Sequence, residues 1–323
     1  MHVVATRVIH RGRRHFSPRL PGCLIVLGMR PRRRPTGDLP DVFLGSAALA
    51  EGLLTMRQLR GPQVARVIRN VYRPAWVQPT HKLKCQAACL VLPPCAVVTG
   101  ASAASVLGLR LASADDDVFV AVPEGLEVPR RAGIRLRRVR DPRPGGEIVD
   151  GVRLAHARRM AFDAAARLPL HEATAALDAL VRHGLIDLPD VCAWLDTCHD
   201  NDVRHVRQAA ALVDARAESQ PESITRVVLV QAGFTVVAQY RVRIGSRVIA
   251  RVDLALPDLK IAIEYDGRWH EDDLQRALDN GRLAELRANG WTVIVVTAEL
   301  LRDHRRLVAT VSAAVAERQA LQR

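Results

Sequence analysis

The sequence predicts a mixed α/β protein built from three consecutive segments. Its 323 residues exceed the roughly 100 to 200 residues that are typical of one domain. With 49% hydrophobic and 25% charged residues, the composition is typical of a globular chain and excludes wholesale disorder. The apolar pattern also alternates between helical and strand periods. We expect a winged helix-turn-helix at 39–84, an α+β and helical connector at 85–216, and an α-β-β-β-α-β core at 217–323.

The first 38 residues carry much of the chain's positive charge. The formal net charge is +13 and the pI is near 10.5, which favours an anionic partner such as nucleic acid. Residues 1–38 contain nine Arg and one acid, and we interpret them as a disordered basic leader. If Met29 is the true start, most of this leader is not translated, and both starts remain open.

The leader's one apolar run, Cys23 to Gly28, is too short for a secretory signal core or a membrane span. We therefore expect a soluble, cytoplasmic protein that has no membrane partner.

Residues 41–59 show two short helical patterns, and Thr55 to Gln58 has the spacing of a capping box that opens the second. Gly61 and Pro62 interrupt the pattern, and Pro62 is suited to the first turn of a further helix. Gln63, Arg66 and Arg69 would share one exposed face of that helix, and residues 71–77 alternate like a strand. This order predicts a winged helix-turn-helix, whose recognition helix enters the major groove.

Seven basic residues and no acid lie between Thr55 and Lys84. Arg and Gln can form paired hydrogen bonds with guanine and adenine, so Gln63 and Arg66 are candidates for base contacts, and the others for phosphate contacts. The alternative is a helix face that is merely solvated. The predicted DNA-binding residues are Arg57, Arg60, Gln63, Arg66, Arg69 and Arg73.

The blocks at 43–46 (FLGS), 52–55 (GLLT), 57–60 (RQLR) and 69–72 (RNVY) resemble the N-terminal winged-helix domain of AbiEi-type antitoxins. The resemblance covers about residues 40 to 160. It implies operator DNA binding, repression of a toxin–antitoxin operon and, by resemblance only, a toxin partner.

The connector predicts structure without an evident catalytic spacing. Alternation at 118–122 and 135–139 predicts a small sheet that ends at the Pro and Gly residues of 142–146. Residues 156–183 and 203–217 predict helices.

Six cysteines without a signal peptide do not indicate a disulfide framework. Cys85 and Cys89 are spaced to share a metal with Cys95 or with Cys198 and His199. The alternative is that they are small apolar residues in a buried helix.

The last third has the order α-β-β-β-α-β-α, and acids interrupt its apolar strands. Asp253 follows the alternation of one strand, while Glu264 and Asp266 lie two apart on the next and project to one face. Buried carboxylates repel one another unless a positive charge joins them. Mg²⁺ or Mn²⁺ would do so and would support hydrolytic nuclease chemistry. Lys260 is the alternative counter-ion.

The motifs at 251–255 (RVDLA), 261–267 (IAIEYDG) and 269–270 (WH) resemble the very-short-patch-repair type of PD-(D/E)XK endonuclease. The likeness spans about residues 217 to 316 and includes 221–223 (PES), the Asp279-x-x-Arg282 spacing and 290–293 (GWTV). It implies a restriction-endonuclease-like core.

The same resemblance assigns roles to individual residues. It makes Asp253 and Glu264 metal ligands, Glu222 the helix carboxylate of the site and His270 a candidate for proton transfer. Asp266 stands where many relatives have lysine, so it would act as a base or as a further metal ligand.

Three of these residues also have structural alternatives. Ser219 and Glu222 have capping-box spacing, so Glu222 can simply cap its own helix. His270 can be an exposed turn residue, and Asp279 with Arg282 a surface pair.

Together these patterns predict a metal-dependent endonuclease that a winged helix delivers to double-stranded DNA. The alternative is a non-catalytic, antitoxin-like regulator with a degenerate nuclease fold. An RNA-directed nuclease ranks last, because an aromatic content of 4% leaves few stacking surfaces for single-stranded bases. A homodimer remains open.

Overall fold

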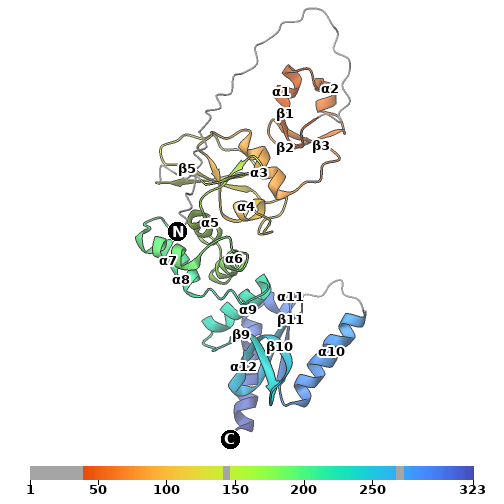
Figure 1. The fold of residues 1–323 in the computed structure, drawn as a ribbon, viewed down its shortest axis with the longest axis vertical. Coiled ribbons are helices and arrows are strands. Elements are labelled where there is room, and N and C mark those ends of the chain that lie inside the picture. Colours follow the sequence, from red (N-terminus) through yellow and green to blue (C-terminus); the bar gives the residue numbers. More distant parts are fainter. Residues whose placement is uncertain (1–38, 141–145, 267–272) are drawn as a thin grey trace, which may run out of the picture. The chain divides into compact units, whose positions relative to one another are not determined.

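The computed structural model describes residues 39–140, 146–266 and 273–323, with the backbone alone for 273–280. The described residues form a mixed α/β protein with helices and four separate β-sheets (Figure 1). This confirms the predicted fold class.

The N-terminal segment combines two short helices with a three-stranded antiparallel sheet in the order β1-β3-β2. The predicted capping box is present, because the Thr55 side chain accepts from the Gln58 backbone and the Gln58 side chain accepts from the Thr55 backbone. The elements are β1 (Phe43–Leu44), α1 (Gly45–Ala50), α2 (Met56–Leu59), β2 (Val64–Ile68) and β3 (Val71–Pro74).

The predicted helix after Pro62 is wrong, because this stretch is strand β2. Three of its five residues, VARVI, are β-branched and favour a pleated strand over a helix. Asn70 follows with φ +68°, a left-handed conformation that asparagine tolerates, and it closes a hairpin in which Ile68 pairs with Val71. Gln63, Arg66 and Arg69 are exposed, but they do not share a helix face.

The middle segment contains the predicted sheet, in the order β4-β5-β6 with β5 and β6 parallel. At Gly100, φ is +57° and a Cβ would lie 3.1 Å from the Asp163 carbonyl oxygen, so glycine lets α4 approach α5 closely. The elements are α3 (His81–Cys89), β4 (Val97–Val98), α4 (Gly100–Val106), β5 (Val118–Pro123), β6 (Ile134–Val139), β7 (Ile148–Val149) and β8 (Val152–Arg153).

Four helices follow, and they differ in length from the prediction. The helix expected at 156–183 is two helices separated near Pro169, and the one expected at 203–217 ends at Ala211. Their buried residues join those of the β5–β6 sheet in one large core. The helices are α5 (Ala157–Ala165), α6 (Leu170–Arg182), α7 (Leu188–Thr197) and α8 (Val203–Ala211).

The C-terminal segment follows the predicted order α-β-β-β-α-β, but the single last helix expected from Glu299 is two helices, because the helical conformation is interrupted at Asp303. Its sheet order is β12-β11-β10-β9, with β11 and β12 parallel and the other pairs antiparallel. The connection between the parallel strands is α10, as such a crossover requires. The elements are α9 (Gln220–Gln231), β9 (Val237–Ile244), β10 (Arg247–Leu256), the 3-10 turn η2 (Pro257–Leu259), β11 (Ile261–Asp266), α10 (Asp273–Ala288), β12 (Thr292–Thr297), α11 (Ala298–Arg302) and α12 (His304–Leu321).

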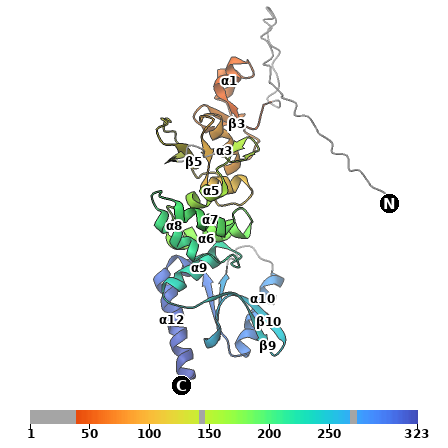
Figure 2. The same cartoon turned by 60° about the vertical axis from the view of Figure 1, so that its left-hand side comes forward.

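Helices cover both faces of this sheet (Figure 2). On one face, residues of α9 and α12 pack against Ile261 and Ile263 of β11. On the other, Leu283 and Leu286 of α10 pack against Ala262. Alternate residues of β11 therefore face opposite helices, as the sequence predicted.

Within the described residues, no helix has both the length and the apolar character needed to cross a membrane.

Candidate functional site

Asp253 and Glu264 come together across two neighbouring strands of the C-terminal sheet. The β10–β11 ladder pairs Leu254, which follows Asp253, with Ile263, which precedes Glu264. Beyond this pair the Tyr265 N–H donates to the Asp253 carboxylate, at 2.8 Å. Glu264 is buried and Asp253 is half-buried. The Asp253 carboxylate therefore lies beside the backbone of the residue that follows Glu264.

The backbone is distorted next to this pair. Gln239 of β9, which lies across from Asp253 in the β9–β10 register, has φ +51°, and such a conformation costs a non-glycine residue about 1 to 3 kcal/mol. On one side of this point Val252 packs toward α10, and on the other Leu254 packs toward α9 and α12. Val252 and Leu254, two residues apart on β10, therefore pack on opposite faces of the sheet, and the regular alternation of side chains is interrupted at Asp253.

Glu222 joins the site from the first turn of α9. Its carboxylate accepts hydrogen bonds from the Ser219 hydroxyl at 2.7 Å, the Glu218 N–H at 2.8 Å and the Gln239 side-chain amide at 2.9 Å. Ser219 in turn caps the Glu222 N–H at 3.3 Å. The predicted capping interaction is confirmed, and the strained Gln239 links this helix end to the sheet.

Arg282 is the arginine that pairs with Glu264 among the described residues. Its two terminal nitrogens donate to the two carboxylate oxygens of Glu264 at 3.1 and 3.3 Å, and one of them also donates to the Arg251 carbonyl at 2.9 Å. The sequence proposed Lys260 as the alternative counter-ion, but Lys260 is exposed and it is Arg282 that pairs with Glu264. In the sequence, Arg282 belongs to the Asp279-x-x-Arg282 spacing of the resemblance, with a surface pair as the alternative. Its pairing with Glu264, 18 residues away, was not predicted.

The charges and the burial in this site shift the pKa of the Asp253 carboxyl. Burial raises the pKa of the Asp253 carboxyl to about 6, although the Tyr265 N–H lowers this pKa. The nearby Glu222 carboxylate raises the pKa further, and Arg282 lowers it. The Asp253 carboxyl thus lies near Glu222, and Arg282 acts on it as well as on Glu264.

The donor atoms of this site suit a hard divalent cation in type. Among the described residues, no group of three or more His, Cys, Asp or Glu is placed so that it could hold a metal ion. Mg²⁺ is usually bound by one or two carboxylates, with waters and substrate phosphates completing its shell, and Asp253 with Glu264 matches that smaller set. Asp266 ends β11, half-buried, beside Thr297 of β12. His270 lies outside the described residues.

The predicted DNA-binding residues lie on α2 and on the hairpin rather than on one helix. Arg57 and Arg60 are exposed on α2 and at its end. Arg73 is different, because its guanidinium donates to the carbonyls of Pro74 at 3.1 Å, Ala75 at 3.2 Å and Val77. Arg73 therefore anchors the chain after β3.

Cys85 is buried and Cys89 is half-buried. Cys85 and Cys89 lie on α3, as their spacing predicted, and burial raises the pKa of the Cys85 thiol to about 12. A thiol that stays protonated is a poor metal ligand, and neither residue belongs to a metal-holding group within the described ranges.

Comparison with known proteins places the chain in a family. No protein-family model matches it. Two Mycobacterium tuberculosis proteins, "Uncharacterized protein MT2308" of strain CDC 1551/Oshkosh and "Uncharacterized protein Rv2248" of strain H37Rv, are each 31% identical to it over 193 residues, 58% of this chain and 67% of theirs. The chain belongs to the family of these two mycobacterial proteins. Their names state no activity.

One solved structure, that of the RV2827C protein from Mycobacterium tuberculosis, overlaps 59% of this chain and 78% of its own. The TM-score is 0.38 at 15% sequence identity, which is too low to indicate a shared fold.

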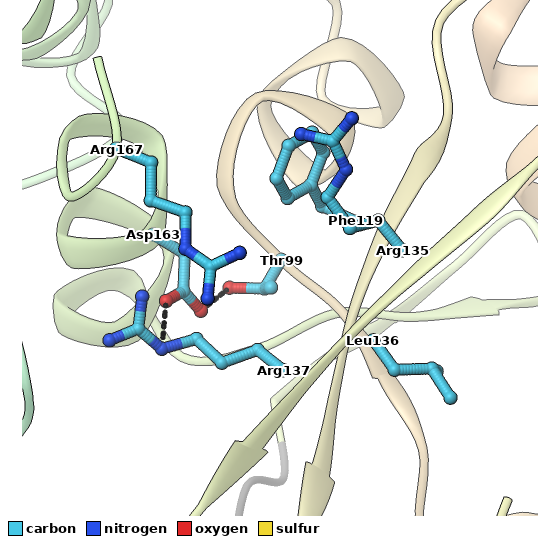
Figure 3. Close-up of a pocket in the computed structure, with 7 residues that line it drawn as sticks. All are labelled: Thr99, Phe119, Arg135, Leu136, Arg137, Asp163 and Arg167. Atoms are coloured by element: carbon cyan, nitrogen blue, oxygen red, sulfur yellow. Dashed lines mark hydrogen bonds and ion pairs between the residues drawn. The ribbon is translucent and has the colours of Figure 1, made fainter. Parts of the chain in front are cut away.

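The middle segment of this family member contains a buried charge cluster that the sequence did not predict. Asp163 of α5 accepts from the Thr99 hydroxyl at 2.8 Å and from Arg159 at 2.7 and 3.0 Å, and it pairs with Arg137 at 3.3 Å. Arg159 also pairs with Asp200. Figure 3 shows Asp163 at the base of a small pocket, with Arg137 bonded to it and Arg167 reaching in from beyond the end of α5. The i, i+4 spacing of Arg159 and Asp163 in an Ala-rich helix is the sequence pattern that could have indicated this cluster.

Proposed function

We propose that the C-terminal segment hydrolyses phosphodiester bonds in DNA with the help of a divalent cation, and that the N-terminal segment holds duplex DNA. The observation that carries this proposal is the placement of two carboxylates, Asp253 and Glu264, on adjacent strands. Asp253 accepts from the N–H of Tyr265, the residue that follows Glu264, and Arg282 acts on both acids. Burial of acids costs free energy unless they are paired, and acids with strongly shifted pKa values cluster at functional sites.

A purely structural role for the acids explains less of the geometry. A structural ion pair would match one acid with one base, as Glu264 and Arg282 do. Asp253 and Glu222 then remain as further acids close to that pair. Burial is the largest cause of the raised pKa of the Asp253 carboxyl, and the nearby Glu222 and Glu218 carboxylates raise this pKa further. A divalent cation would neutralise these carboxylates.

Asp253 and Glu264 would hold the cation, Mg²⁺ or Mn²⁺, with Glu222 and Asp266 as the further acids that the resemblance assigns to the site. When bound, the cation would lower the pKa of a coordinated water and offset charge on the phosphate. Glu222 and Gln239 would orient the strands around Asp253 through their mutual hydrogen bond. His270 stays in the proposal as the candidate for proton transfer.

The proposal includes the finer fold assignment. The order α9-β9-β10-β11-α10-β12 is the one that a restriction-endonuclease-like core implies, and α1, α2 and the β2–β3 hairpin support a winged helix-turn-helix. In this arrangement α2 carries Arg57 and Arg60, and the hairpin carries Gln63, Arg66 and Arg69 as phosphate and base contacts.

A plasmid-nicking assay tests the enzymatic proposal. The full-length protein with Mg²⁺ or Mn²⁺ should nick supercoiled DNA, and Asp253→Asn or Glu264→Gln should reduce the rate by at least about 100-fold, the scale of lost electrostatic stabilisation at a catalytic site. Asp258→Asn is the matched control, because Asp258 is an exposed acid just beyond β10. Nicking that is equal in all four proteins would overturn the proposal.

A non-catalytic DNA-binding regulator is the second candidate. Two observations favour it: Arg282 already neutralises Glu264 through a forked ion pair, and no group of three metal-binding side chains is found among the described residues. In that case Arg57→Ala with Arg60→Ala should abolish binding to duplex DNA, while Asp253→Asn should leave both DNA binding and cation binding unchanged.

A further inference from the structure

The Arg282–Glu264 ion pair occupies the carboxylate that the proposed cation needs. Arg282 uses two nitrogens for the two oxygens of Glu264, so the carboxylate already has a partner on each oxygen. The Arg282 side chain is 31% exposed, whereas that of Glu264 is 10% exposed. The guanidinium is therefore the more exposed partner of this pair.

A guanidinium and a divalent cation compete for the same oxygens, because both are positively charged and repel each other at short range. The guanidinium has an equally good alternative partner when DNA is present, since the fork of an arginine fits a phosphodiester as it fits a carboxylate. The hydrogen bond from Arg282 to the Arg251 carbonyl would hold the side chain beside the site while the exchange takes place.

We propose that Arg282 is a positioning residue that reserves Glu264 until DNA arrives. A phosphodiester then takes over the guanidinium, and Glu264 becomes available to the cation. This inference rests on the proposed function and adds regulation to the same site: cation binding and DNA binding help each other. Because such coupling is reciprocal, the cation also strengthens DNA binding at this site.

Mn²⁺ titration followed by electron paramagnetic resonance tests the inference without relying on cleavage. Full-length protein is titrated alone and with a short duplex whose phosphates are replaced by phosphorothioates to slow hydrolysis. We expect the duplex to tighten Mn²⁺ binding by the native protein. Arg282→Gln should bind Mn²⁺ about tenfold more tightly than the native protein when DNA is absent, the factor that about 1.4 kcal/mol represents, and should gain little from DNA.

Two variants serve as controls. Arg282→Lys keeps the positive charge but cannot form the fork, so its Mn²⁺ affinity should lie between those of the native protein and Arg282→Gln. Arg247→Gln removes an exposed arginine that pairs with Glu285 of α10, and it should bind Mn²⁺ as the native protein does. A variant that merely unfolds the domain would weaken Mn²⁺ binding, which is the opposite of the expected change.

The outcomes separate this inference from the function on which it rests. If Asp253→Asn and Glu264→Gln bind Mn²⁺ as the native protein does, the proposed cation site is wrong. If those two variants lose Mn²⁺ but Arg282→Gln matches the native protein without DNA, the site stands and the role of Arg282 is wrong.

Discussion

Two buried charge clusters lie in different segments of this chain, and they are compensated to different degrees. In the middle segment, Asp163 pairs with Arg137 and Arg159, and Asp200 pairs with Arg159. In the C-terminal segment, Arg282 pairs with Glu264 and also acts on Asp253, which lies near Glu222. We call the first the balanced cluster, because both of its acids form ion pairs with arginine. In the second, Asp253 and Glu222 form no ion pair with any residue that the structure describes.

The surroundings of the two clusters differ in the same way. The arginines of the middle cluster contact aromatic rings: the Arg159 guanidinium lies 4.3 Å from the centre of the Phe162 ring and that of Arg137 4.7 Å from it, and Arg159 lies 5.7 Å from the centre of the Trp194 ring. The C-terminal cluster instead lies beside Gln239, whose backbone is strained, and near the C-terminal end of β11. Acids that are all paired with arginine and packed against aromatic rings are typical of a structural network. Acids without an ion-pair partner, next to a strained backbone, are typical of a functional site.

The largest expected effect is on the balanced cluster. Asp163→Ala leaves Arg137 and Arg159 buried without their shared carboxylate, and it should lower the free energy of unfolding by about 3 to 5 kcal/mol. Urea unfolding of the full-length protein measures this. Glu264→Gln keeps an oxygen that can accept from Arg282, whose side chain is 31% exposed, so it should change the same quantity by about 1 kcal/mol or less. Equal losses in the two variants would remove the distinction between the clusters.

The second effect depends on pH and has the opposite sign. The pKa of the Asp253 carboxyl is about 6 in the folded protein, against an ordinary value of 3.8. Its contribution to stability is therefore fully present below pH 3.8 and is lost as the pH rises through 6. Asp253→Asn stays neutral at every pH, so at pH 8 it should be more stable than the native protein, by at most about 3 kcal/mol.

Thermal unfolding in EDTA between pH 4 and pH 8 tests this. The gain should shrink toward zero near pH 4, and Asp258→Asn should show no such trend because Asp258 is exposed. A gain that does not vary with pH would mean that the substitution acts through packing.

The two clusters also show what the sequence could and could not predict. The alternation of β11 predicted that Glu264 faces away from Ile261 and Ile263, because side-chain direction in a strand depends on local parity alone. The partner of Glu264 could not be predicted in this way, since Arg282 reaches it from another element.

The balanced cluster was missed for the same reason. Thr99, Arg137 and Asp163 come from three separate elements, and only tertiary packing brings them together. In the N-terminal segment the error was local: the spacing of Gln63, Arg66 and Arg69 suits a helix, but the β-branched residues between them and the turn at Asn70 favour a hairpin.

The smallest expected effect is on DNA binding by the N-terminal hairpin, where one arginine is exposed and another is already bonded within the protein. Arg66 is exposed on β2, whereas three backbone carbonyls hold the guanidinium of Arg73 on β3. If Arg66 contacts a DNA phosphate, Arg66→Ala should reduce the slope of log binding constant against log salt concentration by about 0.9, the contribution of one phosphate contact. Arg73→Ala should leave this slope unchanged, because its charge is already engaged within the protein.

Fluorescence anisotropy with a labelled duplex at several salt concentrations measures both slopes. Equal reductions in the two variants would show that the hairpin binds DNA through a surface in which the carbonyl contacts of Arg73 are broken.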